Sequence, residues 1–197
     1  MHDLLTKLGV STELQAFFDL RDLCFSYGDE QEIYGPGFHH VPVSSDLWMS
    51  GKYPATELII SSSAMEAIAY MALNAWRHPA DGSLSFIAVG LRPQPEQLRW
   101  INRYCLKRKI TLVFPNDLCG RLADIVIAAG IRGRPVRPFW NKGNVQLRLK
   151  TQTIELPADK ISLNMFEKAA SLRTGIRTRK PVRFDTFLDQ LRYDNEQ

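Results

Sequence analysis

Residues 112–121, LVFPNDLCGR, read as a strand, a turn and the start of a helix. The apolar run LVF is broken by Pro-Asn-Asp, and Gly120 then opens the amphipathic segment RLADIVIAA. A carboxylate that directly follows the C-terminal end of a strand lies where open α/β sheets bind their ligands. Asp117 is therefore the first candidate for a functional side chain.

Strand and helix patterns alternate around this stretch. Short apolar runs predict strands at 56–61 (TELIIS), 84–90 (LSFIAVG) and 110–114 (ITLVF). Segments with helical patterns follow them at 62–77, 95–108 and 119–130, the last ended by Gly130. A fourth strand is expected near 134–140 (RPVRPFW). This alternation predicts an α/β fold with a Rossmann-like, mostly parallel sheet flanked by helices.

The two ends of the chain have less regular patterns. Ser11 is expected to cap a helix over 12–20, and the stretch 24–54, rich in Gly, Pro and aromatics, favours short antiparallel strands. The C-terminal predictions are a half-exposed strand or hairpin at 145–156, a helix at 160–173 capped by Asp159, a loop at 173–183 and a closing helix at 184–193. We divide the chain into an N-terminal element (1–54), an α/β core (55–140) and a C-terminal extension (141–197), packed as one unit.

The composition is that of a globular protein with one sizeable core. The chain has 197 residues, 45% of them hydrophobic, and no apolar run approaches the roughly 20 residues that span a bilayer. Its start lacks the features of a secretion signal. The three cysteines show no C-x-x-C spacing, so neither a disulfide framework nor structural zinc is favoured. We expect a cytoplasmic protein without membrane contact.

Charge is distributed unevenly along the chain. Residues 1–50 contain two basic and eight acidic side chains, whereas 51–197 contain 23 basic and 13 acidic ones. Within 99–150 there are twelve basic residues against only Asp117 and Asp124. This stretch predicts contact with a polyanion, and the alternative is a solvated surface that only aids solubility.

Two basic clusters are candidates for that contact. Arg99, Arg103 and Lys107 recur every four residues on the predicted helix at 95–108, so they form one stripe that either follows a phosphate backbone or is simply solvated. The predicted loop at 173–183 carries the second cluster.

Serines occupy the junction between the strand at 56–61 and the next helix. The first N–H groups of a helix favour a negative group, so Ser62 and Ser63 are candidates for holding a phosphate; the alternative is a simple helix cap. Glu66 lies one turn beyond Ser62 on the same face. Because ends of neighbouring parallel strands lie close together, we expect Ser62, Glu66 and Asp117 to line one cleft. Two carboxylates would make a weak Mg²⁺ site at best.

The junction of the strand at 56–61 and the helix at 62–77 resembles a motif of a known protein family. Residues 56–131 resemble a Toprim domain, the catalytic α/β module of bacterial primases, topoisomerases and related nucleases. The family's first motif is an apolar strand followed by Glu-Gly, two residues and an acid. Here Ser62 stands in the place of the Glu, Ser63 in that of the Gly and Glu66 in that of the acid.

The second motif of the family is an apolar strand followed by Asp-x-Asp-x-x-Gly. This chain reads PNDLCG, with Pro115 in the place of the first Asp, while Asp117 and Gly120 keep the other positions. The resemblance implies a catalytic Glu and an acidic Mg²⁺ cluster, but serine cannot replace a general acid/base and proline has no side-chain oxygen. The site of Ser62, Glu66 and Asp117 is therefore interpreted as vestigial.

Other residues near the turn complete the candidate phosphate site. Arg121 follows Gly120 at a helix start, where the helix dipole disfavours a cation, so it is expected to hold a phosphate beside Asn116 or to pair with Asp124. The adjacent His39 and His40 point to opposite faces of a strand, which favours a surface or turn role.

Three functional hypotheses follow. The first is a catalytically impaired, Toprim-like protein of a primase-like or mobile-element system that binds nucleic acid, DNA rather than RNA, and has a protein partner in a DNA-processing complex. The second is a Mg²⁺- or Mn²⁺-dependent nuclease or nucleotidyl transferase that uses Glu66, Asp117 and a third acid. The third is an interaction scaffold whose acidic residues 1–50 dock onto its own basic half or onto a partner.

Overall fold

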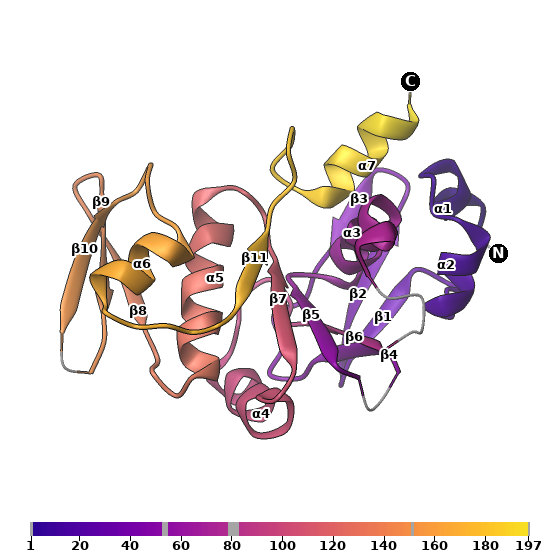
Figure 1. The fold of residues 1–197 in the computed structure, drawn as a ribbon. Helices are drawn as coiled ribbons and strands as arrows, with labels where there is room; N and C mark the ends of the chain where they lie inside the picture. The colour runs from indigo at the N-terminus through magenta and orange to yellow at the C-terminus, as the bar shows by residue number, and fades with distance from the viewer. Residues whose placement is uncertain (1, 53–54, 79–82, 151, 197) are drawn as a thin grey trace.

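The centre of the fold is a sheet of five strands in the order β11-β7-β5-β6-β4, counted over residues 2–52, 55–78, 83–150 and 152–196, which the computed structural model describes. Its strands are β4 (Trp48–Gly51), β5 (Glu57–Ser61), β6 (Leu84–Ala88), β7 (Lys109–Val113) and β11 (Arg177–Arg179). Strand β4 is antiparallel to β6, and the other four strands are parallel. The chain therefore has an α/β fold with a mixed central sheet (Figure 1).

Both faces of this sheet are covered by helices. The helices that follow the strands are α3 (Ala64–Asn74), continued by the short η1 (Ala75–Arg77), α4 (Pro95–Cys105) and α5 (Leu118–Ile131). Neighbouring residues of a strand point to opposite faces, so Ile59 packs with α3 in one core cluster while Leu58 and Ile60 pack with α4 and α5 in another. This double burial explains why β5 and β6 are continuously apolar.

The N-terminal element packs on the α3 side of the sheet. It consists of α1 (Asp3–Lys7), α2 (Thr12–Phe17) and an antiparallel sheet of β1 (Cys24–Tyr27), β2 (Glu30–Gly35) and β3 (Phe38–His40). Ser11 caps α2 as predicted, since its hydroxyl accepts from the backbone N–H of Leu14. The ring centroids of Phe18 and of Phe86 in β6 lie 4.9 Å apart, so this element shares the core of the central sheet.

The C-terminal part divides between the two sides of the molecule. Its elements are an antiparallel sheet of β8 (Arg137–Asn141), β9 (Asn144–Arg148) and β10 (Thr153–Pro157), then α6 (Leu163–Ala169) and α7 (Phe187–Asn195). The sheet and α6 pack against α5, whereas α7 crosses to α3 and lies near the N-terminal helices (Figure 1). Strand β11 connects the two sides as an edge of the central sheet.

Several predicted elements need correction. The stretch 134–140 was expected to be the fourth parallel strand, but β8 pairs with β9 in the separate antiparallel sheet. The fourth parallel strand is β11, inside the predicted loop 173–183, where three polar residues on a sheet edge leave no apolar pattern. Because six strands form two antiparallel sheets and the central sheet is mixed, the expected mostly parallel sheet does not describe the whole chain.

Two predicted helix boundaries are also wrong. Gly130 lies within α5, which ends at Ile131; a Cβ on Gly130 would come within 2.5 Å of Leu98 Cδ1, so the glycine serves the close packing of α4 on α5. Helix α6 covers 163–169 and is capped by Ser162 rather than Asp159, since the hydroxyl of Ser162 accepts from the N–H of Met165. None of the helices in the described ranges is both long enough and apolar enough to cross a membrane.

Candidate functional site

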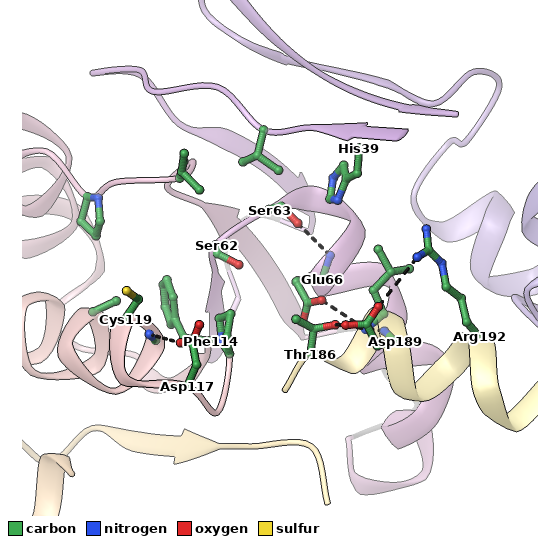
Figure 2. A pocket seen from close by; sticks show the side chains of 17 residues that line it. His39, Ser62, Ser63, Glu66, Phe114, Asp117, Cys119, Thr186, Asp189 and Arg192 are labelled. Carbon is green, nitrogen blue, oxygen red and sulfur yellow. Dashed lines mark hydrogen bonds and ion pairs between the residues drawn. The ribbon is translucent and has the colours of Figure 1, made fainter. Parts of the chain in front are cut away.

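The carboxyl ends of β5 and β7 frame a pocket of about 400 Å³ (Figure 2). The register pairs Ser61 with Val113, so the turns after both strands leave the sheet at the same edge. Ser62, Glu66 and Asp117 all line this pocket, together with residues of β3 and α7. The structure thus places the three predicted residues around one cleft.

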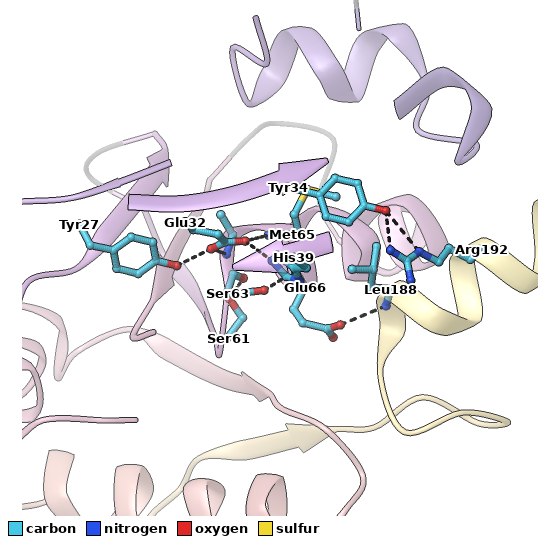
Figure 3. A network of polar contacts seen from close by, with 11 residues as sticks. Tyr27, Glu32, Tyr34, His39, Ser61, Ser63, Met65, Glu66, Leu188 and Arg192 are labelled. Atoms are coloured by element: carbon cyan, nitrogen blue, oxygen red, sulfur yellow. Dashed lines mark hydrogen bonds and ion pairs between the residues drawn. The ribbon is translucent and has the colours of Figure 1, made fainter. Parts of the chain in front are cut away.

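The carboxylate of Glu66 is buried and fully engaged with α7. Its two oxygens accept hydrogen bonds of 3.1 Å from the backbone N–H groups of Phe187 and Leu188, the first residues of that helix (Figure 3). Burial raises the pKa of Glu66 to about 7, against the opposing effect of these two donors. Glu66 therefore anchors the C-terminal helix and leaves no oxygen free of a partner for a metal.

A second buried acid, Glu32 of β2, occupies the N-terminus of α3. Its carboxylate accepts from the N–H groups of Ala64 (2.7 Å) and Met65 (3.0 Å). The hydroxyl of Tyr27 donates to the same carboxylate at 2.7 Å, and Nε2 of His39 lies 2.9 Å from it (Figure 3). An anion at a helix start is stabilised by the unpaired N–H groups and the helix dipole. The protein's own carboxylate thus fills the position where the sequence predicted a phosphate.

The two serines have different roles at this junction. Ser63 is buried and caps α3, because its hydroxyl accepts from the N–H of Glu66 at 3.1 Å. With Glu32 on the two preceding amides, the first three N–H groups of α3 all have partners. Ser62 is half-buried and lines the pocket. The alternative of a helix cap therefore describes Ser63, and the first amides of α3 serve that cap and an internal acid. The phosphate role of Ser62 stays a prediction.

Sequence reasoning missed Glu32 because it lies in the polar start of β2, beside Glu30 and Gln31. The strand alternates, with Glu32 and Tyr34 on the buried side and Gln31 and Ile33 on the exposed side. That period of two, counted back from Tyr34, is the signal that could have identified an inward-facing acid. His39 was predicted to have a surface or turn role, yet it faces Glu32 and the pocket, and its side chain is only 22% exposed.

The turn after β7 is held by its own side chains. Asp117 is exposed and caps α5, since its Oδ1 accepts from the N–H of Gly120 at 2.7 Å. The Arg121 guanidinium donates to the backbone oxygen of Asn116 (3.1 Å) and to its Oδ1 (3.3 Å). The alternative ion pair of Arg121 with Asp124 is wrong, because Asp124 pairs elsewhere. Asn116 and Arg121 therefore hold the turn together.

The partner of Asp124 is Lys180, which directly follows β11. Its Nζ lies 2.6 Å from Oδ2 of Asp124 and donates to the backbone oxygens of Phe114 (3.1 Å) and Pro115 (2.9 Å). Burial raises the pKa of Asp124 to about 6 and lowers that of Lys180, while their mutual attraction opposes both shifts. An ammonium group thus satisfies three oxygens beneath the turn that carries Asp117.

The acids of the pocket do not fit the Mg²⁺ that the Toprim resemblance implies. Among the described residues there is no group of three or more His, Cys, Asp or Glu placed to hold a metal ion. Both oxygens of Glu66 are bonded to α7, one oxygen of Asp117 caps α5, and Pro115 offers no side-chain ligand. The third acid that lines the pocket, Asp189, accepts at its Oδ2 from the hydroxyl of Thr186 at 2.6 Å. A hard cation needs several oxygen ligands, which this donor set does not supply.

The predicted basic stripe lies outside this pocket. Arg99 and Arg103 are exposed on α4, whereas Lys107 lies in the turn beyond the end of that helix. Arg99 pairs with Glu96 at 2.5 Å, and the guanidinium of Arg103 lies 5.5 Å from the ring of Tyr104. These are contacts of a solvated surface, open to a second partner.

Comparisons of the chain with protein-family models, with curated proteins and with solved structures gave no match. The Toprim resemblance therefore rests on the motif frame around Ser62 and Asp117. Any function has to be argued from the site and from the surface charge.

Proposed function

We propose that the chain is a Toprim-like protein that binds nucleic acid without processing it, as part of a primase-like or mobile-element DNA-processing system. The observation that carries the proposal is the positive surface formed by residues 99–150. Polyphosphate backbones bind such surfaces by releasing counterions, with little dependence on sequence. DNA is the expected partner, through the Toprim resemblance.

The side chains of this stretch support a real excess of surface charge. Nine of its cations are exposed: Arg99, Arg103, Lys107, Lys109, Arg134, Arg137, Lys142, Arg148 and Lys150. Of its two acids, Asp124 is buried and neutralised by Lys180, so Asp117 is the one that reaches the surface. None of the ion pairs among the described residues joins the acidic residues 1–50 to these cations. The positive surface therefore remains open to a partner of opposite charge.

Binding without catalysis is supported by the side chains found at the two Toprim-like motifs. The resemblance places the family's general acid/base at Ser62, and the hydroxyl of serine does not titrate near neutral pH. Glu32 provides an internal anion at α3, and the Lys180 ammonium an internal cation beneath the second motif. The first amides of α3 and the carbonyl oxygens of Phe114 and Pro115 therefore have internal partners and do not need a ligand.

The test is fluorescence anisotropy of labelled single-stranded and double-stranded DNA with the full chain at 20–200 mM salt, measured with and without EDTA. Affinity is expected to fall steeply as salt rises, and EDTA is expected to have no effect. No binding at the lowest salt would contradict the proposal, because phosphate-driven affinity is greatest there.

One observation favours the alternative of a metal-dependent nuclease or nucleotidyl transferase. Glu66, with a pKa raised to about 7, shares a pocket with Asp117, and a carboxyl of this kind suits general acid/base work. Metal titration with Mg²⁺ and Mn²⁺, followed by activity assays on DNA and nucleotides, distinguishes this enzyme from a protein that only binds nucleic acid. Activity that disappears in Asp117→Ala would favour the enzyme.

A further inference from the structure

A basic hollow of about 790 Å³ lies on the antiparallel sheet of β8 and β9, outside the strand-end pocket. The described residues that line it include no acid and four cations: Arg134, Arg137, Arg148 and Lys150. It begins at Gly133, just after α5 ends, whereas Asp117 precedes the start of the same helix. Because α5 has 14 residues, the hollow lies about 20 Å from the Toprim-like motif.

The sheet register places two of these cations directly opposite each other. Arg137 of β8 and Arg148 of β9 are cross-strand partners, so both side chains leave the same face of the sheet. Like charges in this relation destabilise a sheet. Neither arginine belongs to any of the ion pairs found in the described part of the chain. A bound anion between them would remove the repulsion.

Two aromatic side chains of β8 are exposed, and one of them lies beside these cations. Phe139 is on the same face as Arg137, is 42% exposed, and has the guanidinium carbon of Arg148 at 4.3 Å from its ring centroid. The next residue, Trp140, is 64% exposed on the opposite face of the strand and does not line the hollow. Edge strands are usually protected by charges and proline, a role that Arg137 and Pro138 already fill, so protection of the edge does not explain two exposed rings.

The acid nearest to these groups on the sheet lies on the same face, two residues along β10 from the partner of Arg148, and it is engaged with another side chain. Glu155 of β10 faces Gln146 across the ladder, and its Oε1 accepts from Nδ2 of Asn144 at 2.8 Å. It does not line the hollow. The end of the sheet at Arg137 and Arg148 therefore combines two cations that have no ion pair among the described residues with the partly exposed ring of Phe139.

We propose that this hollow is the binding site for single-stranded nucleic acid, with Arg137, Arg148 and Lys150 on the phosphates and a base stacked on Phe139. This inference rests on the proposed function and adds to it the location and the type of strand. Base stacking on an aromatic side chain requires an unpaired base, which a duplex does not present. Arginine beside the ring suits both phosphate contact and stacking.

The test compares matched variants of the full chain by anisotropy with fluorescein-labelled dT20 and with a 20-base-pair duplex. The variant Arg137→Gln/Arg148→Gln removes the facing cations, and Lys160→Gln/Lys168→Gln removes the same charge from exposed sites outside the hollow. We expect the first variant to bind dT20 about tenfold or more weakly, with a salt slope smaller by about 1.4, and the control to change binding less than twofold. Phe139→Leu, which keeps an apolar side chain beneath Arg148, should lose about tenfold on dT20 and little on the duplex.

Thermal melting of the same variants checks that they fold. Because the facing charges repel each other, their removal should leave the melting temperature unchanged or higher. Cross-linking of wild type to a 5-iodouracil oligonucleotide, mapped by mass spectrometry, requires no substitution and should label the peptide that contains Phe139 and Trp140. Equal affinities of the arginine variant and its lysine control would overturn this location while leaving the proposed function intact. If Phe139→Leu leaves the ratio of the dT20 affinity to the duplex affinity unchanged, the single-strand assignment is overturned. Absence of binding by wild type would remove both proposals.

Discussion

At the residue scale, buried carboxylates decide what the strand-end pocket is used for. Glu32 and Glu66 each sit at the first N–H groups of a helix, α3 and α7 respectively. A carboxylate there satisfies donors that have no partner within the helix. Glu66, which the motif frame would assign to metal chemistry, and Glu32, which lies outside that frame, therefore both serve helix termini and connect segments far apart in the sequence.

The raised pKa of Glu66 predicts a specific pH dependence of stability. Its pKa is about 7 in the folded chain against an ordinary value of 4.5, so its favourable contribution is present at low pH and is lost as pH rises through 7. The free energy of unfolding of wild type relative to Glu66→Gln should fall by up to about 3 kcal/mol between pH 4.5 and 8. Urea denaturation of both proteins across this range measures the difference, and a constant difference would contradict the assignment. Asp124 titrates in both proteins and cancels.

Removal of the Glu32 charge should destabilise the chain strongly. Glu32→Gln places an amide N–H₂ against backbone N–H donors and breaks bonds to a charged acceptor, so the expected loss is about 2–4 kcal/mol. Glu30→Gln is the matched control, because Glu30 is exposed on the same strand and should change stability by less than about 0.5 kcal/mol. Chemical denaturation monitored by circular dichroism compares them. Equal stabilities of the two variants would show that the network around α3 contributes little.

At the scale of elements, short and polar segments complete the central sheet. Strand β11 has three residues, and the Lys180 that follows it binds the end of β7 and Asp124 of α5. Its three residues are polar and lie on a sheet edge, so the strand has no recognisable local pattern. Its place at the edge depends on pairing with β7 and on a buried ion pair.

This ion pair predicts a non-additive double-mutant cycle. Lys180→Met leaves Asp124 buried without a counter-charge, so it should cost about 3–5 kcal/mol. The double variant Lys180→Met/Asp124→Leu removes both charges and should recover most of that loss. Denaturation of the wild type, both single variants and the double variant gives the coupling energy. A double variant whose loss equals the sum of the single losses would show that the two side chains do not interact.

At the scale of the whole molecule, the N-terminal element, the α/β core and the C-terminal extension share hydrophobic cores. One core cluster combines Leu5 and Phe18 with Ile68 and with Leu191, so both ends of the chain pack on α3. The antiparallel sheet and α6 instead belong to the cluster with α5. Residues of the predicted N-terminal element (1–54) and C-terminal extension (141–197) thus pack together with those of the α/β core.

The shared cores predict one cooperative unfolding transition. Because β5 contributes alternate residues to both clusters, neither side of the sheet can unfold without exposing the other. Differential scanning calorimetry should give a single peak with a calorimetric enthalpy equal to the van't Hoff enthalpy. Phe18→Ala, at the N-terminal end, and Ile154→Ala, in the far sheet, should both shift that whole peak. Two separate peaks would contradict a single unit.

The sequence by itself determined those elements whose patterns are local. Alternating apolar runs and helical periods between residues 56 and 131 predicted β5, α3, β6, α4, β7 and α5, because burial on one or both faces imposes its period on the chain. The same reasoning placed Ser62, Glu66 and Asp117 at the ends of neighbouring strands, where one pocket contains them.

Only the tertiary structure decided how the charges in that pocket are used. Glu32 reaches α3 from β2, Lys180 reaches β7 from the end of β11, and α7 meets Glu66 across more than 100 residues. These contacts depend on which side chains are brought together after burial, and electrostatic pairing of this kind has no sequence period. The turn LVFPNDLCGR predicted the correct edge of the sheet, but the distant residues that fill that edge determine its chemistry.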